Sequence, residues 1–218
     1  MTFCLLIVAK APVPGFAKTR LCPPATPEQA AGIAAASLLD TLDAALLTHR
    51  ARIVVALTGE LGDAARGEEI AAVLENTDVI PQRGNGFDVR LANAHADTAA
   101  LHPGFPVLQI GMDTPQVTPD SLAAAAEPLT TRDSVLGLAE DGGWWALGLA
   151  DPAHAKALAG VPMSRHDTGR ETLRALTDVG LCPRALPTLS DVDTITDARR
   201  VAAANPHGRF ARAVVEVR

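Results

Sequence analysis

Residues 3–9 read Phe-Cys-Leu-Leu-Ile-Val-Ala, and residues 106–110 read Pro-Val-Leu-Gln-Ile. Both runs are apolar without the alternation of a half-exposed strand, so each is predicted to be a strand that helices cover on both faces. Longer Ala/Leu-rich amphipathic stretches separate these runs from other short apolar ones. Strands that alternate with helices predict βαβ units around a mostly parallel sheet, and therefore an α/β fold.

Helix-start signals and short apolar runs predict the remaining elements. Thr26 is placed as an N-cap with Gln29 positioned to bond back, and Thr194 and Asp197 form a similar pair. Predicted strands cover residues 3–9, 52–57, 77–80, 106–110, 134–138 and 144–149, with 183–186 extended and 210–217 as a final edge strand. Predicted helices cover residues 27–49, 63–75, 88–100, 168–179 and 194–204, and another begins at 118–119.

Composition limits the class of protein. The chain has 218 residues, of which 48% are hydrophobic, and we expect one domain over residues 1–218. A net charge of -6 argues against nucleic acid or an anionic membrane as a partner. Three cysteines without a CxxC pair favour a cytoplasmic protein over a disulfide-rich one. The apolar run at 3–9 is too short for a signal sequence or a membrane span.

Ligands of such folds bind beyond the carboxyl ends of the strands, so the loops there hold the candidate residues. The loop after residues 3–9 contains two prolines, a glycine and three cations, which suit the binding of phosphates. A stiff surface loop with solvated cations is an equally good interpretation. The candidate nucleotide-binding residues of this loop are Ala9, Lys10, Ala11, Pro12, Gly15, Lys18 and Arg20.

Two acidic segments are candidate metal sites. Asp113 follows the strand at 106–110, where a carboxylate would suit Mg²⁺, although an isolated Asp-x-Pro more often caps a turn. Asp191 and Asp193 alternate along the chain, so they are expected to face opposite ways. One of them could reach a metal while the other caps the last helix, and capping alone is the favoured interpretation.

Two glycine-containing turns are further candidates. Asp141, Gly142 and Gly143 precede Trp144, where glycine allows either close approach to a ligand or, more simply, a hairpin. Trp144 and Trp145 alternate, so at most one is expected to point to the site. The turn with Gln82 and Gly84 lies before a helix and could hold a base or an anion, or be an ordinary glycine turn. The sequence contains neither HExxH nor GxSxG, so a metalloprotease or a serine hydrolase has no support.

Five segments in order resemble a known family. They read AKAPVPGFAKTRL, a Gln-Gly-rich turn, GMDTP, EDGGWWALGL and LPTLSDVDT. This order resembles the glycosyltransferase-A-like proteins of domain-of-unknown-function family 2064, relatives of 2-phospho-L-lactate guanylyltransferase and of the molybdenum-cofactor nucleotidyltransferases. The resemblance extends from about Leu5 to Asp197. It implies the nucleotide-diphospho-sugar transferase fold, which is a Rossmann-like three-layer sandwich.

The resemblance also implies roles for individual residues. Lys18 and Arg20 would neutralise nucleotide phosphates, Asp113 and Asp193 would hold Mg²⁺ or Mn²⁺, and the segment from Asp141 to Trp144 would line the acceptor side. The turn here reads GNGFDVRL in place of the family's Gly-Asp-Leu-Gly-x-Arg, and two tryptophans replace the usual tyrosines.

The function expected from these residues is metal-dependent nucleotidyl transfer. A phosphorylated small molecule would attack the α-phosphate of an NTP and release pyrophosphate, with Lys18, Arg20 and Asp113 as the catalytic residues. Glycosyl transfer from an NDP-sugar is the first alternative, and an inactive nucleotide-binding domain is the second. The expected partners are a nucleotide and a small acceptor, and we allow for a homodimer.

Overall fold

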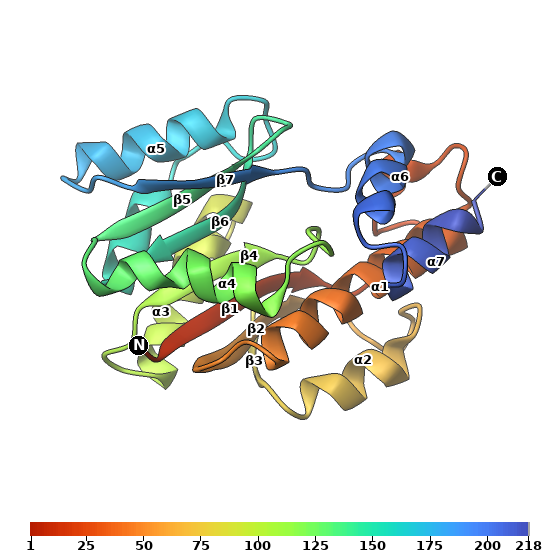
Figure 1. Cartoon of the computed structure of the whole chain (residues 1–218), viewed down its shortest axis with the longest axis horizontal. Helices are drawn as coiled ribbons and strands as arrows, with labels where there is room; N and C mark the ends of the chain where they lie inside the picture. The colour runs from red at the N-terminus through yellow and green to blue at the C-terminus, as the bar shows by residue number, and fades with distance from the viewer. Residues whose placement is uncertain (218) are drawn as a thin grey trace.

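A seven-stranded sheet forms the centre of the computed structural model, which describes residues 1–217 (Figure 1). The strands are β1 (Phe3–Lys10), β2 (Ala51–Thr58), β3 (Asp78–Pro81), β4 (Val107–Gly111), β5 (Ser134–Ala139), β6 (Trp144–Leu149) and β7 (Arg184–Leu189). Their order is β3-β2-β1-β4-β6-β5-β7. Only β6 runs antiparallel to its neighbours β4 and β5, because a short hairpin joins it to β5. The prediction of a mostly parallel sheet is therefore confirmed.

Helices cover both faces of the sheet. They are α1 (Pro27–Leu46), α2 (Gly67–Leu74), α3 (Phe87–Leu101), α4 (Pro119–Ala126), α5 (Thr168–Asp178), α6 (Ile195–Ala204) and α7 (Arg209–Val215). Short 3₁₀ helices cover Thr19–Leu21, Glu127–Thr130 and Pro152–Leu158. The N-caps Thr26, Thr118 and Thr194 each accept a hydrogen bond from the backbone N–H three residues later, which confirms the helix starts predicted there.

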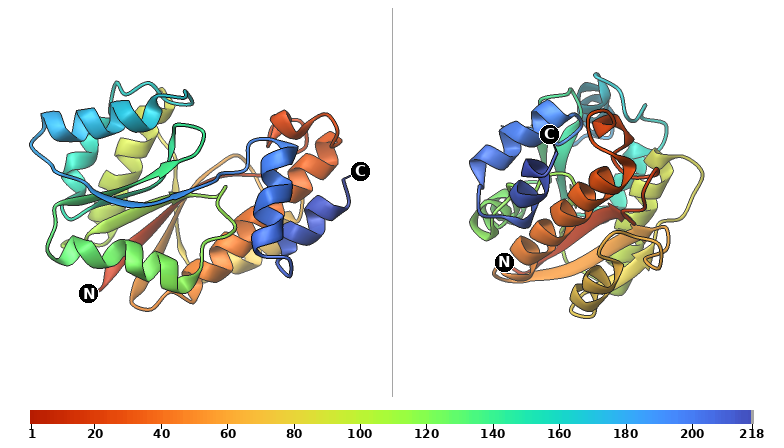
Figure 2. Two further views of the ribbon diagram at one scale, coloured as in Figure 1. Left: turned by 45° about the horizontal axis from the view of Figure 1, so that its top comes forward. Right: turned by 90° about the vertical axis from the view of Figure 1, so that its right-hand side faces the viewer.

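Two apolar cores separate three layers. Leu38 of α1, Ile70 of α2 and Leu122 of α4 pack with strand residues such as Ile7 on one face of the sheet. The helices α3 and α5 and the 3₁₀ helix at 152–158 pack on the opposite face. The three-layer sandwich is confirmed. A third apolar cluster joins α6 and α7 to the outer side of α1, as Figure 2 shows.

Several predicted boundaries are wrong. Residues 210–217 were predicted to be an edge strand, but Arg209–Val215 form α7, whose Phe210, Ala211 and Val214 are buried at helical spacing. Asp40 of α1 accepts hydrogen bonds from the backbone N–H groups of Arg209 and Phe210, which fixes the start of α7. The predicted helix over 63–75 begins only at Gly67, α1 ends at Leu46, and β7 extends to Leu189.

The sheet reverses its winding between β1 and β4. From β1 the chain adds β2 and β3 on one side and then returns to place β4 on the other. A crevice therefore opens beyond the carboxyl ends of β1 and β4, which is the usual ligand position in such sheets. Among residues 1–217, no helix has both the length and the apolar character needed to cross a membrane.

Candidate functional site

A cavity of about 690 Å³ lies at the carboxyl ends of β1 and β4. The turn after β1, the start of α3, the β5–β6 hairpin, the loop before α5 and the segment between β7 and α6 also contribute to its walls. The predicted site residues that line it are Lys10, Lys18, Arg20, Asp113, Asp141, Gly143, Trp144 and Asp193. Segments of the chain that are far apart in sequence thus meet at one edge of the sheet.

Other predicted nucleotide-binding residues support the walls instead. The side-chain nitrogen of Gln82 donates to the carbonyl oxygens of Ala9 (2.8 Å) and Ala56 (2.9 Å), and so ties the ends of β1 and β2 together. The backbone N–H of Ala11 donates to Thr58, and the carbonyl of Pro12 accepts from Ala65. The residues predicted for the site that fall outside the cavity lining are Ala9, Ala11, Pro12, Gly15, Gln82, Gly84 and Gly142.

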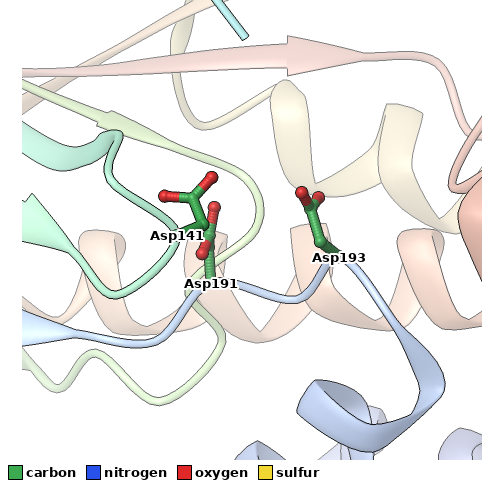
Figure 3. Close-up of side chains that lie close together, drawn as sticks. All are labelled: Asp141, Asp191 and Asp193. Carbon is green, nitrogen blue, oxygen red and sulfur yellow. The ribbon is translucent and has the colours of Figure 1, made fainter. Parts of the chain in front are cut away.

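Three carboxylates meet at this cavity. One oxygen from each of Asp141, Asp191 and Asp193 lies within 4.8 Å of the others. Figure 3 shows Asp141 on the β5–β6 hairpin, and Asp191 and Asp193 on the segment that follows β7. Burial raises the pKa of Asp191 to about 6, and the neighbouring charges of Asp141 and Asp193 add to this rise. A divalent cation would relieve that repulsion, and carboxylate oxygens are the ligands that Mg²⁺ and Mn²⁺ prefer.

This cluster revises the expected arrangement of acids. Asp191 and Asp193 were expected to face opposite ways as on a strand, with helix capping favoured for the pair. Residues 190–193 follow β7 without being a strand, so the alternation does not apply and both carboxylates reach Asp141. The cap of α6 is Thr194, paired with Asp197 as predicted.

A second group of charges joins β4 to the same segment. The Lys18 ammonium lies 2.8 Å from the Asp113 carboxylate and 3.9 Å from Asp193, and it also donates to the carbonyl of Val192. Only 10% of the Lys18 side chain is exposed, whereas 67% of the Arg20 side chain is. Arg20 lies 2.7 Å from Asp193. Lys18 therefore holds the 191–193 segment against Asp113, whereas Arg20, which also lines the cavity, stays largely exposed.

Glycine is required where the hairpin places Asp141. Gly142 has a φ of +90°, and a Cβ atom there would collide with the backbone carbonyl of His166. The carboxylate of Asp141 accepts a hydrogen bond of 2.7 Å from the backbone N–H of Gly143. The predicted hairpin is therefore correct, and its close approach to the loop before α5 fixes the position of one acid of the cluster.

Both tryptophans line the cavity, although at most one was expected to. The two side chains lie on opposite faces of the sheet. The indole nitrogen of Trp144 donates to the hydroxyl of Thr172 in α5, and that of Trp145 donates to the carbonyl of Pro187 in β7. The alternation of the pair is correct. The cavity wraps over the end of the sheet, and so it reaches both faces.

Sequence reasoning missed several residues of the cavity wall. Phe16 is 70% exposed, and its ring lies 6.0 Å from the Lys10 ammonium. Gln109 on β4 and Arg165 and His166 before α5 also line the cavity. Gln109 was the one detectable case, since it is a polar residue inside an apolar strand. Nothing in the local sequence marks the other three.

The sequence and the fold were compared with known proteins. The family model DUF2064, described as an uncharacterized protein conserved in bacteria, matches residues 41–165. The chain belongs to this family. The resemblance inferred from the motifs is therefore confirmed. No curated protein sequence matches the chain.

Solved structures that are similar to this chain support the same fold. A protein from Desulfovibrio desulfuricans G20, provisionally assigned as a nucleotide-diphospho-sugar transferase, is 25% identical with a TM-score of 0.85, over 99% of this chain and 95% of that one. The manganese complex of Rv0371c from Mycobacterium tuberculosis is 21% identical with a TM-score of 0.55, over 92% and 98% of the two chains. A CMP:2-keto-3-deoxy-manno-octonic acid synthetase in complex with CTP is 12% identical with a TM-score of 0.57, over 93% and 98%. The predicted nucleotide-diphospho-sugar transferase fold is confirmed, and the prediction of a transferase agrees with these neighbours.

Proposed function

We propose that this DUF2064 protein is a metal-dependent nucleotidyltransferase, which joins the NMP part of an NTP to a phosphorylated small molecule and releases pyrophosphate. The observation that carries the proposal is the cluster of Asp141, Asp191 and Asp193 at a cavity that Lys10 and Arg20 also line. Acids that can hold a metal and cations that can hold phosphates are the two requirements of such a reaction. The structural similarity to a synthetase bound to CTP supports a nucleotide as the ligand.

The three carboxylates fit a hard divalent cation. Asp141, Asp191 and Asp193 would supply three oxygen ligands, which suits Mg²⁺ or Mn²⁺. The manganese complex of the similar Rv0371c protein supports this assignment. Asp113 remains a predicted ligand, and its carboxylate would first have to leave the Lys18 ammonium, which lies 2.8 Å away.

The protein's part in the reaction is to position the substrates and to balance charge. A bound divalent cation would neutralise the phosphate oxygens that gain charge as pyrophosphate leaves. Arg20 would donate to phosphate oxygens from the exposed part of its guanidinium, and Lys10 would do so from the end of β1. Lys18 would hold the Asp113 carboxylate beside the 191–193 segment. Such positioning in line with the leaving group accounts for much of the rate in phosphoryl-type transfers.

One observation favours glycosyl transfer as a second candidate. The Desulfovibrio desulfuricans protein that aligns over 99% of this chain is provisionally assigned as a nucleotide-diphospho-sugar transferase. The same metal site would then hold the diphosphate of an NDP-sugar. The loop before α5, with Arg165 and His166 at the cavity, would face the sugar or the acceptor.

Ligand binding with and without metal tests both candidates. The stability of the wild-type protein would be measured by thermal shift with each NTP and with several NDP-sugars, in EDTA, MgCl₂ or MnCl₂. Asp191→Asn removes one carboxylate of the cluster. Asp178→Asn is the matched control, because that side chain is 71% exposed at the end of α5. A ligand at about 100 times its dissociation constant stabilises by roughly 2.7 kcal/mol, which gives a measurable shift.

The outcomes separate the candidates. Metal-dependent stabilisation by an NTP, lost in Asp191→Asn and kept in Asp178→Asn, supports nucleotidyl transfer. Pyrophosphate release from that NTP in the presence of a panel of phosphorylated metabolites then identifies the acceptor. Stabilisation by NDP-sugars alone would favour glycosyl transfer. Absence of any metal-dependent shift would refute the proposed site.

A further inference from the structure

A buried polar pair lies behind the apolar side of the cavity. Gln109 on β4 is 2% exposed and His95 on α3 is 0% exposed. Their surroundings on this face of the sheet are apolar side chains of β1, α3 and β6. Gln109 lines the cavity and is a polar residue among the apolar side chains of this face.

Three enclosed polar atoms of this pair lack a hydrogen-bond partner of good geometry among the described residues. Within residues 1–217, Oε1 of Gln109 and both ring nitrogens of His95 find no partner with hydrogen-bonding geometry. The side chain of Gln109 lies against His95, and this contact partly offsets the fall in the pKa of His95 that burial causes. Oε1 of Gln109 is enclosed beside His95, so a ligand in the cavity would meet the amide N–H₂ group of Gln109. Buried polar groups in folded proteins are normally paired, and a donor that borders a cavity therefore points to a ligand.

Apolar side chains line this part of the cavity. Val8 of β1, Phe87 and Leu91 of α3, Trp144 of β6 and Met163 line it. Lys10 follows Val8 by two residues on the same strand, so it points to the same face about 6.6 Å further along. A ligand with its phosphates at Lys10 therefore extends its uncharged part between aromatic and aliphatic side chains toward Gln109.

We propose that the Gln109 side-chain amide hydrogen-bonds the edge of the nucleobase, with Phe87, Leu91 and Trp144 as the walls of the base pocket. This inference rests on the proposed function, since it assumes a nucleotide in the cavity. The amide nitrogen offers N–H donors, which match the ring-nitrogen and carbonyl acceptors on the edge of a base. Gln109 would thereby contribute to the choice among NTPs, and His95 behind it would orient the amide.

Isothermal titration calorimetry with each NTP and with inorganic tripolyphosphate, all with MgCl₂, tests the inference on the full-length protein. Gln109→Met keeps the length of the side chain and removes the amide. Gln109→Glu keeps the shape and replaces the N–H₂ donor with an oxygen, and thermal unfolding reports whether each variant is folded. Tripolyphosphate is the control ligand because it carries the phosphates without a base.

Wild-type protein is expected to bind one NTP more tightly than the others and than tripolyphosphate. In Gln109→Met that NTP should bind roughly 5- to 10-fold more weakly, the size of one lost hydrogen bond, with tripolyphosphate unchanged. Gln109→Glu should alter the order of preference among the NTPs. Unchanged NTP preference in both variants would overturn the inference, as would equal weakening of NTP and tripolyphosphate. If wild type binds tripolyphosphate as tightly as every NTP, the base pocket is wrong and the phosphate site stands. If it binds none of them, the proposed function fails as well.

Discussion

Acid should destabilise this protein partly through one histidine. Burial lowers the pKa of His95 to about 4, whereas an unfolded chain gives histidine its ordinary value of 6.5. The unfolded state therefore takes up a proton on this group at a higher pH than the folded state does. The stability that neutral His95 preserves is fully present above pH 6.5 and is lost as the pH falls toward 4.

The magnitude follows from the two pKa values of His95, about 4 folded and 6.5 unfolded. At about 1.4 kcal/mol for each pH unit, the full loss is roughly 3 kcal/mol, and about 2 kcal/mol of it should appear between pH 7.5 and pH 5. His95→Gln removes the titrating group. The free energy of unfolding of wild type should fall by about 2 kcal/mol more than that of the variant over this range.

Urea unfolding at both pH values, followed by tryptophan fluorescence in EDTA, measures this difference. His207→Gln is the matched control, since His207 is exposed. The raised pKa of Asp191 works in the opposite direction, because its folded form binds a proton more readily than the unfolded chain. That contribution is common to wild type and variants, so it cancels in the comparison. Equal losses in wild type and His95→Gln would refute the reasoning.

Two further substitutions probe the acidic cluster. Asp191→Asn should raise the melting temperature in EDTA at pH 8, because it removes a half-buried carboxylate that Asp141 and Asp193 repel. MnCl₂ should stabilise the wild-type protein more than this variant. A lower melting temperature of the variant in EDTA would contradict this prediction. Gly142→Ala should lower both the melting temperature and the stabilisation by MnCl₂, because its Cβ meets the backbone of His166. Gly160→Ala is the control, because Gly160 has the same φ of +90° and open space around its Cβ position, so this variant measures the cost of backbone strain alone. Equal effects of the two glycine variants would show that the collision between a Cβ atom at 142 and the backbone of His166 is unimportant.

Local patterns were sufficient for most of the fold. The apolar runs of β1 and β4 predicted buried parallel strands because a strand covered on both faces has no polar side to display. Thr26, Thr118 and Thr194 marked helix starts because capping involves only residues within one turn. The end of the chain was predicted wrongly, since Phe210–Val217 suits a strand by composition and becomes α7 only through Asp40 and the apolar side of α1.

The roles within the site depend on contacts between distant segments. The sequence by itself determined the α/β class, the loops at the carboxyl ends of the strands, and which of those loops carry acids and cations. Tertiary structure alone decided that Asp141 joins Asp191 and Asp193, that Lys18 pairs with Asp113 rather than facing open solvent, and that Gln109 borders the cavity. The physical reason is the sequence distance over which each effect acts. Strand and cap signals act over a few residues, whereas the charge state and the partners of a carboxylate depend on the distant segments that the sheet order brings beside it.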